Sequence, residues 1–300
     1  MTFVLETEGL AKRYGRHEAL ADCNLQIPEG RVVGLVGPNG AGKSTFLGLA
    51  CGLIQPSEGT IKVLGHHPAA STDQLARVGF VAQDTPVYAN LTVAEHLRLG
   101  AELNPRWDQK LAERQVRQLN LKLDHKAGRL SGGQRAQLAL TIAAAKRPEL
   151  LIFDEPVAAL DPLARRGFLQ NLMEFVAELE ASVILSSHLL GDLERICDHV
   201  VVLGDGRVQL AGEADDLVAE HYRLVGAQGD FDDLPQEIEI IQAAHTDRQT
   251  TLIVRSSGPI PHHFSEATHL DLEDIILAYM SRSAYASVTG TAQQFMEARQ

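Results

Sequence analysis

The chain has 300 residues, of which 45% are hydrophobic and 22% charged, a composition typical of folded globular proteins and not of disordered or fibrous chains. Its length fits about two domains. The net charge of -12 argues against nonspecific nucleic-acid binding, because such binding needs positive surface charge to neutralise phosphates.

Strand-like and helix-like patterns alternate through the first two thirds of the chain. In chain order we expect strands at 31–36, 78–81, 150–153, 182–185, 200–203 and 208–211, helices at 43–53, 163–179 and 189–196, and mostly helix over 92–147. Gly204-Asp205-Gly206 predicts a hairpin turn. Continuous apolar strands separated by helices predict an α/β fold whose parallel sheet is covered on both faces.

The composition changes after about residue 222. No lysine follows Lys146, and residues 221–300 contain five arginines, eleven acids and five histidines. We expect strands at 238–245 and 251–254 and a helix at 272–280. These features predict a small accessory α/β unit over 223–300, after a main domain over 1–222.

The sequence shows no sign of secretion, membrane insertion or cross-linking. The first eight residues have no basic segment, so no secretory signal is expected. The apolar stretch 136–145 is too short to span a bilayer. Cys23, Cys51 and Cys197 form no closely spaced pair, so structural disulfides and a zinc site are not expected.

A glycine-rich loop follows the expected strand at 31–36 and precedes the expected helix. It matches the pattern G-x-x-x-x-G-K-[ST], whose backbone N–H groups surround phosphate oxygens at a helix N-terminus. Lys43 can reach the β- and γ-phosphates, and the Ser44 hydroxyl can bind Mg²⁺. The other nucleotide-binding candidates in this loop are Gly37, Asn39, Gly40, Gly42 and Thr45.

The apolar strand at 150–153 ends in two adjacent acids. Ligands of open α/β sheets bind at the carboxyl ends of the strands. Neighbouring residues of an extended chain point to opposite sides, so we expect different roles for the two. Asp154 would hold Mg²⁺ through water, and Glu155 would polarise an attacking water. A solvated strand end is the alternative for a lone acid.

Leu130-Ser131-Gly132-Gly133-Gln134 precedes a helix expected to reach about Lys146. Ser131 is a good N-cap, and the glycines expose the first N–H groups of the helix to an anion. The fragment alone predicts no more than a turn. Gln134 stands twenty residues before Asp154, and this position favours a functional role for the fragment.

At this point the sequence resembles the ATP-binding subunits of ABC transporters over about residues 1–222. The segment 130–134 is identical to the family's signature sequence, 37–45 resembles its Walker A loop, and 150–155 resembles its Walker B strand with the catalytic glutamate. Four further residues resemble the adenine-stacking aromatic, the Q-loop glutamine, the D-loop aspartate and the switch histidine, namely Tyr14, Gln83, Asp161 and His188.

The resemblance implies a P-loop ABC-type ATPase domain with a helical subdomain at about 84–147. It implies ATP and Mg²⁺ as cofactors, with Ser44, Gln83 and Asp154 at the metal. It assigns catalysis to Glu155, His188 and Gln83. Nucleotide contacts would come from Tyr14, the loop 37–45, Ser131, Gly132, Gly133, Gln134 and Asp161.

The resemblance also implies partners. Two ATPase subunits, in a homodimer or a heterodimer, would associate head to tail, so that Ser131 and Gly133 of one contact the γ-phosphate held by Lys43 of the other. A separate transmembrane permease would supply the transport path. The subunit would be cytoplasmic and peripheral on the inner face of the cell membrane, with no nucleic-acid partner.

The chain departs from the family pattern at three places. Val157-Ala158-Ala159 replaces the common Thr-Ser-Gly before the D-loop, Ala82 replaces a common proline, and the stretch 140–145 lacks a common basic residue. None removes a phosphate, metal or water ligand, so we expect activity to survive.

The direction of transport rests on analogy alone. The extension of roughly 80 residues resembles that of drug or antibiotic exporters more than the longer regulatory domains of sugar importers. The alternative is a soluble ATP-driven switch without a membrane partner. The single phosphate loop and the lack of a heptad run argue against it. A nucleotide sensor without hydrolysis is disfavoured by the presence of Glu155 and His188.

Overall fold

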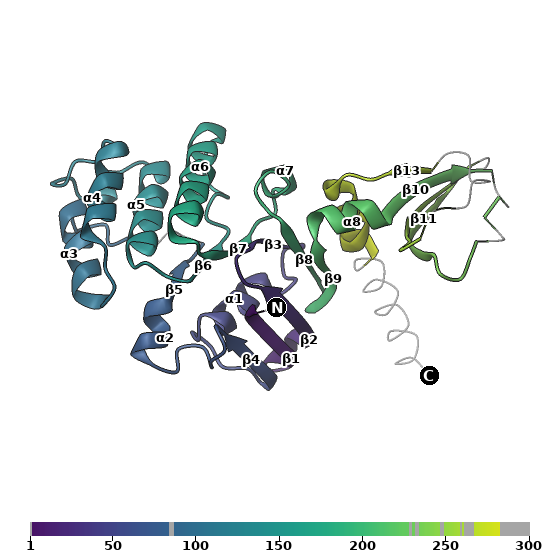
Figure 1. Cartoon of the computed structure of the whole chain (residues 1–300), viewed down its shortest axis with the longest axis horizontal. Coiled ribbons are helices and arrows are strands. Elements are labelled where there is room, and N and C mark those ends of the chain that lie inside the picture. Colours follow the sequence, from purple (N-terminus) through teal and green to yellow (C-terminus); the bar gives the residue numbers. More distant parts are fainter. Residues whose placement is uncertain are drawn as a thin grey trace.

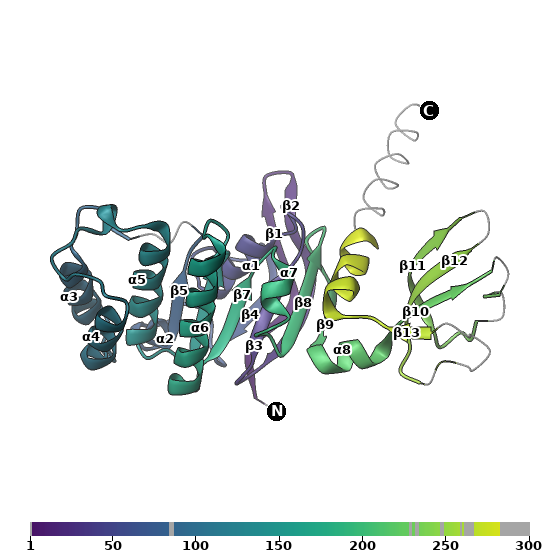
Figure 2. The ribbon, with the colours of Figure 1, turned by 90° about the horizontal axis from the view of Figure 1, so that it is seen from above.

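The computed structural model of the chain describes residues 2–83, 87–227, 230–231, 234–246, 249–258, 260 and 267–282. Three sheets and their helices form an elongated molecule (Figure 1). Helices α3 (Val93–Leu103) and α4 (Gln109–Gln118) lie at one end and a small C-terminal sheet at the other. A view turned by 90° shows the same succession along the long axis (Figure 2).

A six-stranded sheet forms the centre of the molecule, in the order β5-β6-β7-β3-β8-β9. Its first five strands run parallel, and β9 pairs antiparallel with β8 through the expected hairpin at residues 204–207. The strands are β5 (Val78–Val81), β6 (Leu150–Asp154), β7 (Ser182–Ser186), β3 (Val32–Val36), β8 (His199–Gly204) and β9 (Arg207–Glu213).

Both faces of this sheet are buried, as its continuous apolar strands predict. Along β6, Leu150 and Ile152 belong to one hydrophobic core, whereas Leu151 and Phe153 belong to the other. All four are fully buried. Successive side chains of a strand point to opposite faces, so an uninterrupted apolar run supplies both cores.

A three-stranded antiparallel sheet, in the order β2-β1-β4, covers one core. Its strands are β1 (Phe3–Tyr14), β2 (His17–Pro28) and β4 (Glu58–Val63). Helix α1 (Lys43–Ala50) buries Phe46 and Leu47 in the core that these strands share with the central sheet. These three strands were not among those expected from the sequence.

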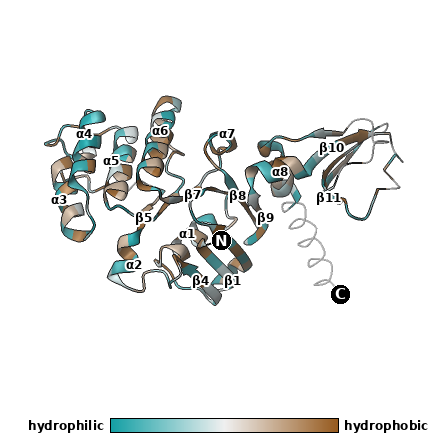
Figure 3. Cartoon of the chain, in the orientation of Figure 1, coloured by the Kyte–Doolittle hydropathy of each residue, from teal (hydrophilic) through white to brown (hydrophobic). Residues whose placement is uncertain are grey.

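Helices cover the other face of the central sheet. Helix α5 (Gly132–Ala145) begins at a capping box in which Ser131 and Gln134 bond each other's backbone N–H. Helix α6 (Pro162–Leu179) is capped by Asp161 and mixes hydrophobic and hydrophilic residues along its length (Figure 3). The shorter helices are α2 (Thr72–Arg77), α7 (Leu190–Leu193), α8 (Ala214–Glu220) and the 3-10 turn η1 (Ala127–Arg129).

The C-terminal part holds a four-stranded antiparallel sheet, in the order β11-β12-β10-β13, and a helix at 272–282. The strands are β10 (His221–Gly226), β11 (Glu239–His245), β12 (Thr250–Arg255) and β13 (Ala267–His269). The expected strands at 238–245 and 251–254 and the expected helix are confirmed. Strand β10 runs across residue 222, where the composition changes.

The α/β fold with a parallel sheet is therefore confirmed, with two corrections to helix length. The helix expected at 43–53 ends at Ala50, after which Gly52 takes a positive φ of 71°. The helix expected at 189–196 is only the four residues Leu190–Leu193. The first residues of the expected helical subdomain, 84–86, and residues 283–300 lie outside the described residues.

Candidate functional site: a nucleotide pocket at the sheet edge

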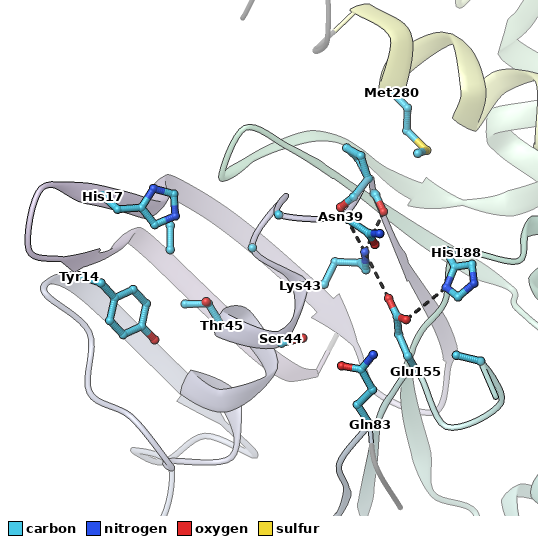
Figure 4. A pocket seen from close by; sticks show the side chains of 16 residues that line it. Tyr14, His17, Asn39, Lys43, Ser44, Thr45, Gln83, Glu155, His188 and Met280 are labelled. Carbon is cyan, nitrogen blue, oxygen red and sulfur yellow. Dashed lines mark hydrogen bonds and ion pairs between the residues drawn. The ribbon is translucent and has the colours of Figure 1, made fainter. Parts of the chain in front are cut away.

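A pocket of about 810 Å³ opens where β3 and β6 end at the carboxyl edge of the central sheet. Its volume falls within the range of about 300–1,000 Å³ common for small-molecule sites. Figure 4 shows its side chains converging from elements far apart in the sequence. The lining residues are Tyr14, His17, Ala19, Gly37, Pro38, Asn39, Gly40, Gly42, Lys43, Ser44, Thr45, Gln83, Glu155, Ala158, His188 and Met280.

Lys43 starts α1 and points its ammonium group into the glycine-rich loop. Its side chain is 6% exposed, and Nζ donates to the carbonyls of Gly37 at 2.8 Å and Pro38 at 3.2 Å. Nζ also lies 3.5 Å from Oε1 of Glu155. A buried amine beside the N-terminus of a helix gives the loop strong attraction for a phosphate.

The loop can adopt this shape only with glycine at particular positions. Gly42, the residue before α1, has φ of 100°, and a Cβ there would lie 2.6 Å from the carbonyl oxygen of Ala19. A Cβ on Gly37 would lie 2.3 Å from the carbonyl oxygen of Leu203. Any side chain at either position would push the loop away from β2 or β8.

The two acids at the end of β6, Asp154 and Glu155, are joined through Ser186 at the end of β7. The Ser186 hydroxyl donates to Oδ1 of Asp154 at 2.8 Å and accepts from the backbone N–H of Glu155 at 2.9 Å. Asp154 is 6% exposed and is not among the residues that line the pocket. Ser186 was not among the expected site residues, because no motif marks a serine that only strand pairing brings beside Asp154.

Glu155 does not continue the strand, which corrects the expectation that the two acids lie on one extended segment. Its φ of 46° is left-handed, a conformation that costs a non-glycine residue about 1–2 kcal/mol. The turn brings Glu155 to the pocket, where Oε2 lies 3.1 Å from Nδ1 of His188. Figure 4 shows Glu155 between Lys43 and His188.

The side-chain oxygen atoms at this edge of the sheet are suitable ligands for the magnesium ion of a magnesium–nucleotide complex. Ser44 offers a hydroxyl, Gln83 an amide oxygen and Asp154 a buried carboxylate. Mg²⁺ prefers oxygen ligands and usually keeps water and substrate phosphates among them. The described residues contain no cluster of three or more His, Cys, Asp or Glu side chains able to hold a metal alone.

The signature residues lie outside this pocket. Ser131, Gly132, Gly133, Gln134 and Asp161 are absent from its lining, and Ser131 and Asp161 cap helices α5 and α6. The Gln134 side chain bonds the backbone N–H of Ser131. One chain thus leaves the signature residues away from the pocket. It brings together eleven of the expected site residues, namely Tyr14, Gly37, Asn39, Gly40, Gly42, Lys43, Ser44, Thr45, Gln83, Glu155 and His188.

Four lining side chains had no assigned role in the sequence reasoning. His17 and Ala19 reach the pocket from β2, because the β1–β2 hairpin turns directly after Tyr14. Ala158 belongs to the stretch that departs from the family pattern. Met280 comes from the helix at 272–282, and no sequence signal places it there.

Comparison with known proteins supports the nucleotide assignment. Residues 20–158 match the family model described as ABC transporter. A probable sulfate/thiosulfate import ATP-binding protein CysA of Chlorella vulgaris is 35% identical over 70% of this chain and 91% of that protein. This chain belongs to the ABC transporter ATP-binding proteins. The Nod factor export ATP-binding protein I of Cupriavidus metallidurans is 32% identical over 73% of this chain and 74% of that protein.

Solved ABC ATP-binding subunits share the fold. The structure of an ATP-binding subunit of an ABC transporter is 32% identical, with a TM-score of 0.65, over 73% of this chain and 92% of that one. A dimeric ATP-binding cassette with bound ADP and Pi is 26% identical, with a TM-score of 0.61, over 70% of this chain and 98% of that one.

The ABC subunit described here is an ATPase that binds ATP. Subunits of this family dimerise and work with a transmembrane permease. Among the described residues of this subunit, no helix is both long and apolar enough to cross a bilayer.

Proposed function

We propose that two copies of this ATPase, or one copy and a related subunit, associate head to tail and share two ATP molecules. Ser131 and Gly133 of one subunit complete the site around Lys43 of the other. The observation that carries this proposal is that the α5 N-terminus, suited to an anion, lies outside the pocket. Lys43 is the only lysine or arginine among the described residues that line the pocket, so one chain leaves γ-phosphate charge uncompensated.

Glu155 is the general base in this proposal. Phosphate oxygens attract the Lys43 ammonium, which otherwise lies 3.5 Å from Glu155 Oε1, and the carboxylate is then available to a water. Glu155 takes a proton from that water as its oxygen attacks the γ-phosphorus and the bond to the leaving ADP breaks. His188 holds the opposite carboxylate oxygen at 3.1 Å and so orients the base.

Ser44, Gln83 and Asp154 are the residues that would hold Mg²⁺, with Asp154 kept in place by Ser186. When bound, the ion would supply positive charge to neutralise the phosphate oxygens. Tyr14 is 48% exposed, and Nζ of Lys12 lies 5.2 Å from the centroid of its ring. The exposed ring of Tyr14 provides a face for adenine.

The subunit drives a separate permease from the cytoplasmic side of the membrane, and transport is outward. The extension over 223–300 is short, as in drug or antibiotic exporters, and this analogy of length supports export. Residues 1–222 are the ATPase domain in this proposal, with 84–147 as its helical subdomain. Relatives named for import and for export are about equally identical, 35% and 32%. Export predicts that ATP added to inside-out vesicles carrying the subunit and its permease drives substrate into the lumen.

The shared site is tested by Glu155→Gln. This variant should bind ATP normally, lose about 10²- to 10⁴-fold in turnover and accumulate as a dimer with ATP in sedimentation experiments. Glu102→Gln, an exposed substitution on α3, is the matched control and should behave as wild type. Normal turnover by Glu155→Gln would refute its role as base. Full activity of a strictly monomeric preparation, independent of dilution, would refute the shared site.

A further inference from the structure

The helix at 272–282 reaches the nucleotide pocket from outside the ATPase domain. Met280 lines this pocket together with Asn39 and His188. Figure 4 shows Met280 on the side of Asn39 and His188, far from Tyr14. Met280 therefore lies over the phosphate end of the pocket and not over the adenine end.

The same face of this helix also lies beside residues 188–190, which we call the His188 loop. Glu273 and Leu277 stand seven and three residues before Met280, a spacing that places all three on one helix face. Glu273 and Leu277 line a second cavity of about 510 Å³ together with His188, Leu190 and Arg195. Leu277 remains 45% exposed, so this face lies beside the His188 loop without packing tightly against it.

The opposite face of the helix is held firmly. Ile275, Ile276 and Tyr279 are at most 4% exposed and share a core with Leu210 of β9 and Leu217 of α8. Tyr279 Oη also lies 3.1 Å from Nε2 of His221. The packing of this helix on β9 and α8 therefore determines where Met280 lies.

Methionine is a poor neighbour for a phosphate. Its thioether has no hydrogen to donate and accepts only weakly, whereas a γ-phosphate requires donors and positive charge. The pocket still measures about 810 Å³ with Met280 in place, which leaves room for a nucleotide. Met280 therefore covers the approach to the phosphates while leaving space for ATP itself.

We propose that the helix at 272–282 is an autoinhibitory contact, in which Met280 covers the phosphate end of the pocket against the Ser131 helix terminus of a second copy. The inference rests on the proposed shared site. Dimer closure then requires Met280 to move aside, so a shift of this helix on β9 and α8 changes the affinity between subunits. ATP binding to the single subunit is unaffected, because the nucleotide volume stays open.

The experiment compares full-length chains in the Glu155→Gln background, in which hydrolysis does not reopen the dimer. Met280→Ala removes the covering side chain, and Met280→Trp enlarges it. Leu277→Ala is the matched control, because it shortens a side chain of the same helix that does not line the nucleotide pocket. Sedimentation equilibrium with saturating ATP gives the dimer dissociation constant, and calorimetry gives the affinity for ATP.

Met280→Ala should tighten the ATP-dependent dimer about fivefold or more, and Met280→Trp should weaken it. An unchanged or weaker dimer with Met280→Ala would overturn the autoinhibitory contact, as would an equal effect of Leu277→Ala. If every variant binds ATP and none dimerises, the shared site itself fails. Dimerisation of all variants with one common dissociation constant refutes only the role of Met280.

Discussion

The hydroxyl of Ser186 donates a hydrogen bond of 2.8 Å to the carboxylate of Asp154. The two residues are direct partners in the parallel pairing of β6 with β7, and Ser186 is fully buried. The same hydroxyl accepts the backbone N–H of Glu155 in its left-handed conformation. One side chain therefore positions both the proposed metal ligand and the proposed base.

Replacing Ser186 by alanine should lower kcat about 10- to 100-fold, as loss of the group that orients a metal ligand commonly does. KM for ATP should change little, because Lys43 and the glycine-rich loop are untouched. Ser186→Thr retains the hydroxyl and should restore most of the activity. Steady-state kinetics with thermal unfolding separates this positioning role from simple instability. Equal loss in the alanine and threonine variants would argue against the hydroxyl.

Packing within one chain already requires glycine at position 133. A Cβ on Gly133 would lie 2.9 Å from the Cβ of Ala164 on α6. Gly133→Ala should therefore destabilise the α5–α6 contact by about 1–3 kcal/mol, typical of overpacking, and should abolish ATPase activity. The double variant Gly133→Ala, Ala164→Gly removes the clash and should regain stability. If Gly133 also contacts the phosphate of a partner, the double variant stays inactive. Full recovery of activity would show that packing alone requires the glycine.

Acid should weaken the junction between the two parts of the chain through His221. This residue is fully buried, with Nδ1 2.6 Å from the carbonyl oxygen of Leu217 and Nε2 3.1 Å from Tyr279 Oη. Burial lowers the pKa of His221 below its ordinary 6.5. Because the folded-state pKa is depressed, the stability that the neutral ring contributes is complete above about pH 6.5 and is lost as the pH falls through the folded-state pKa.

The free energy of unfolding in urea should therefore fall between pH 7.5 and 5.5, with at most about 1.4 kcal/mol attributable to His221. His221→Phe cannot take up a proton and should show a smaller difference between the two pH values. The same pH difference in wild type and variant would exclude His221 as the cause.

Much of the site was predictable because its pieces are contiguous. Residues 37–45 contain the loop that follows β3 and the start of α1, so local glycine conformations and one helix terminus already make a phosphate site. Strand β6 and the two acids at its end are likewise contiguous in the sequence. The N-terminal strands were missed because β1 pairs with residues up to Val63 and is broken by bulges, which disturb the alternation that marks a strand.

The phosphate loop, the acidic strand end and the ABC signature could be read from the amino-acid sequence, since each consists of neighbouring residues whose chemistry depends on local backbone geometry. The positions of Ser186 beside Asp154 and of Met280 at the phosphate end of the pocket emerge only from the folded molecule. Both placements depend on which strands pair and on where a distant helix packs. Those outcomes come from burying apolar surface across the whole molecule, and no short segment encodes them.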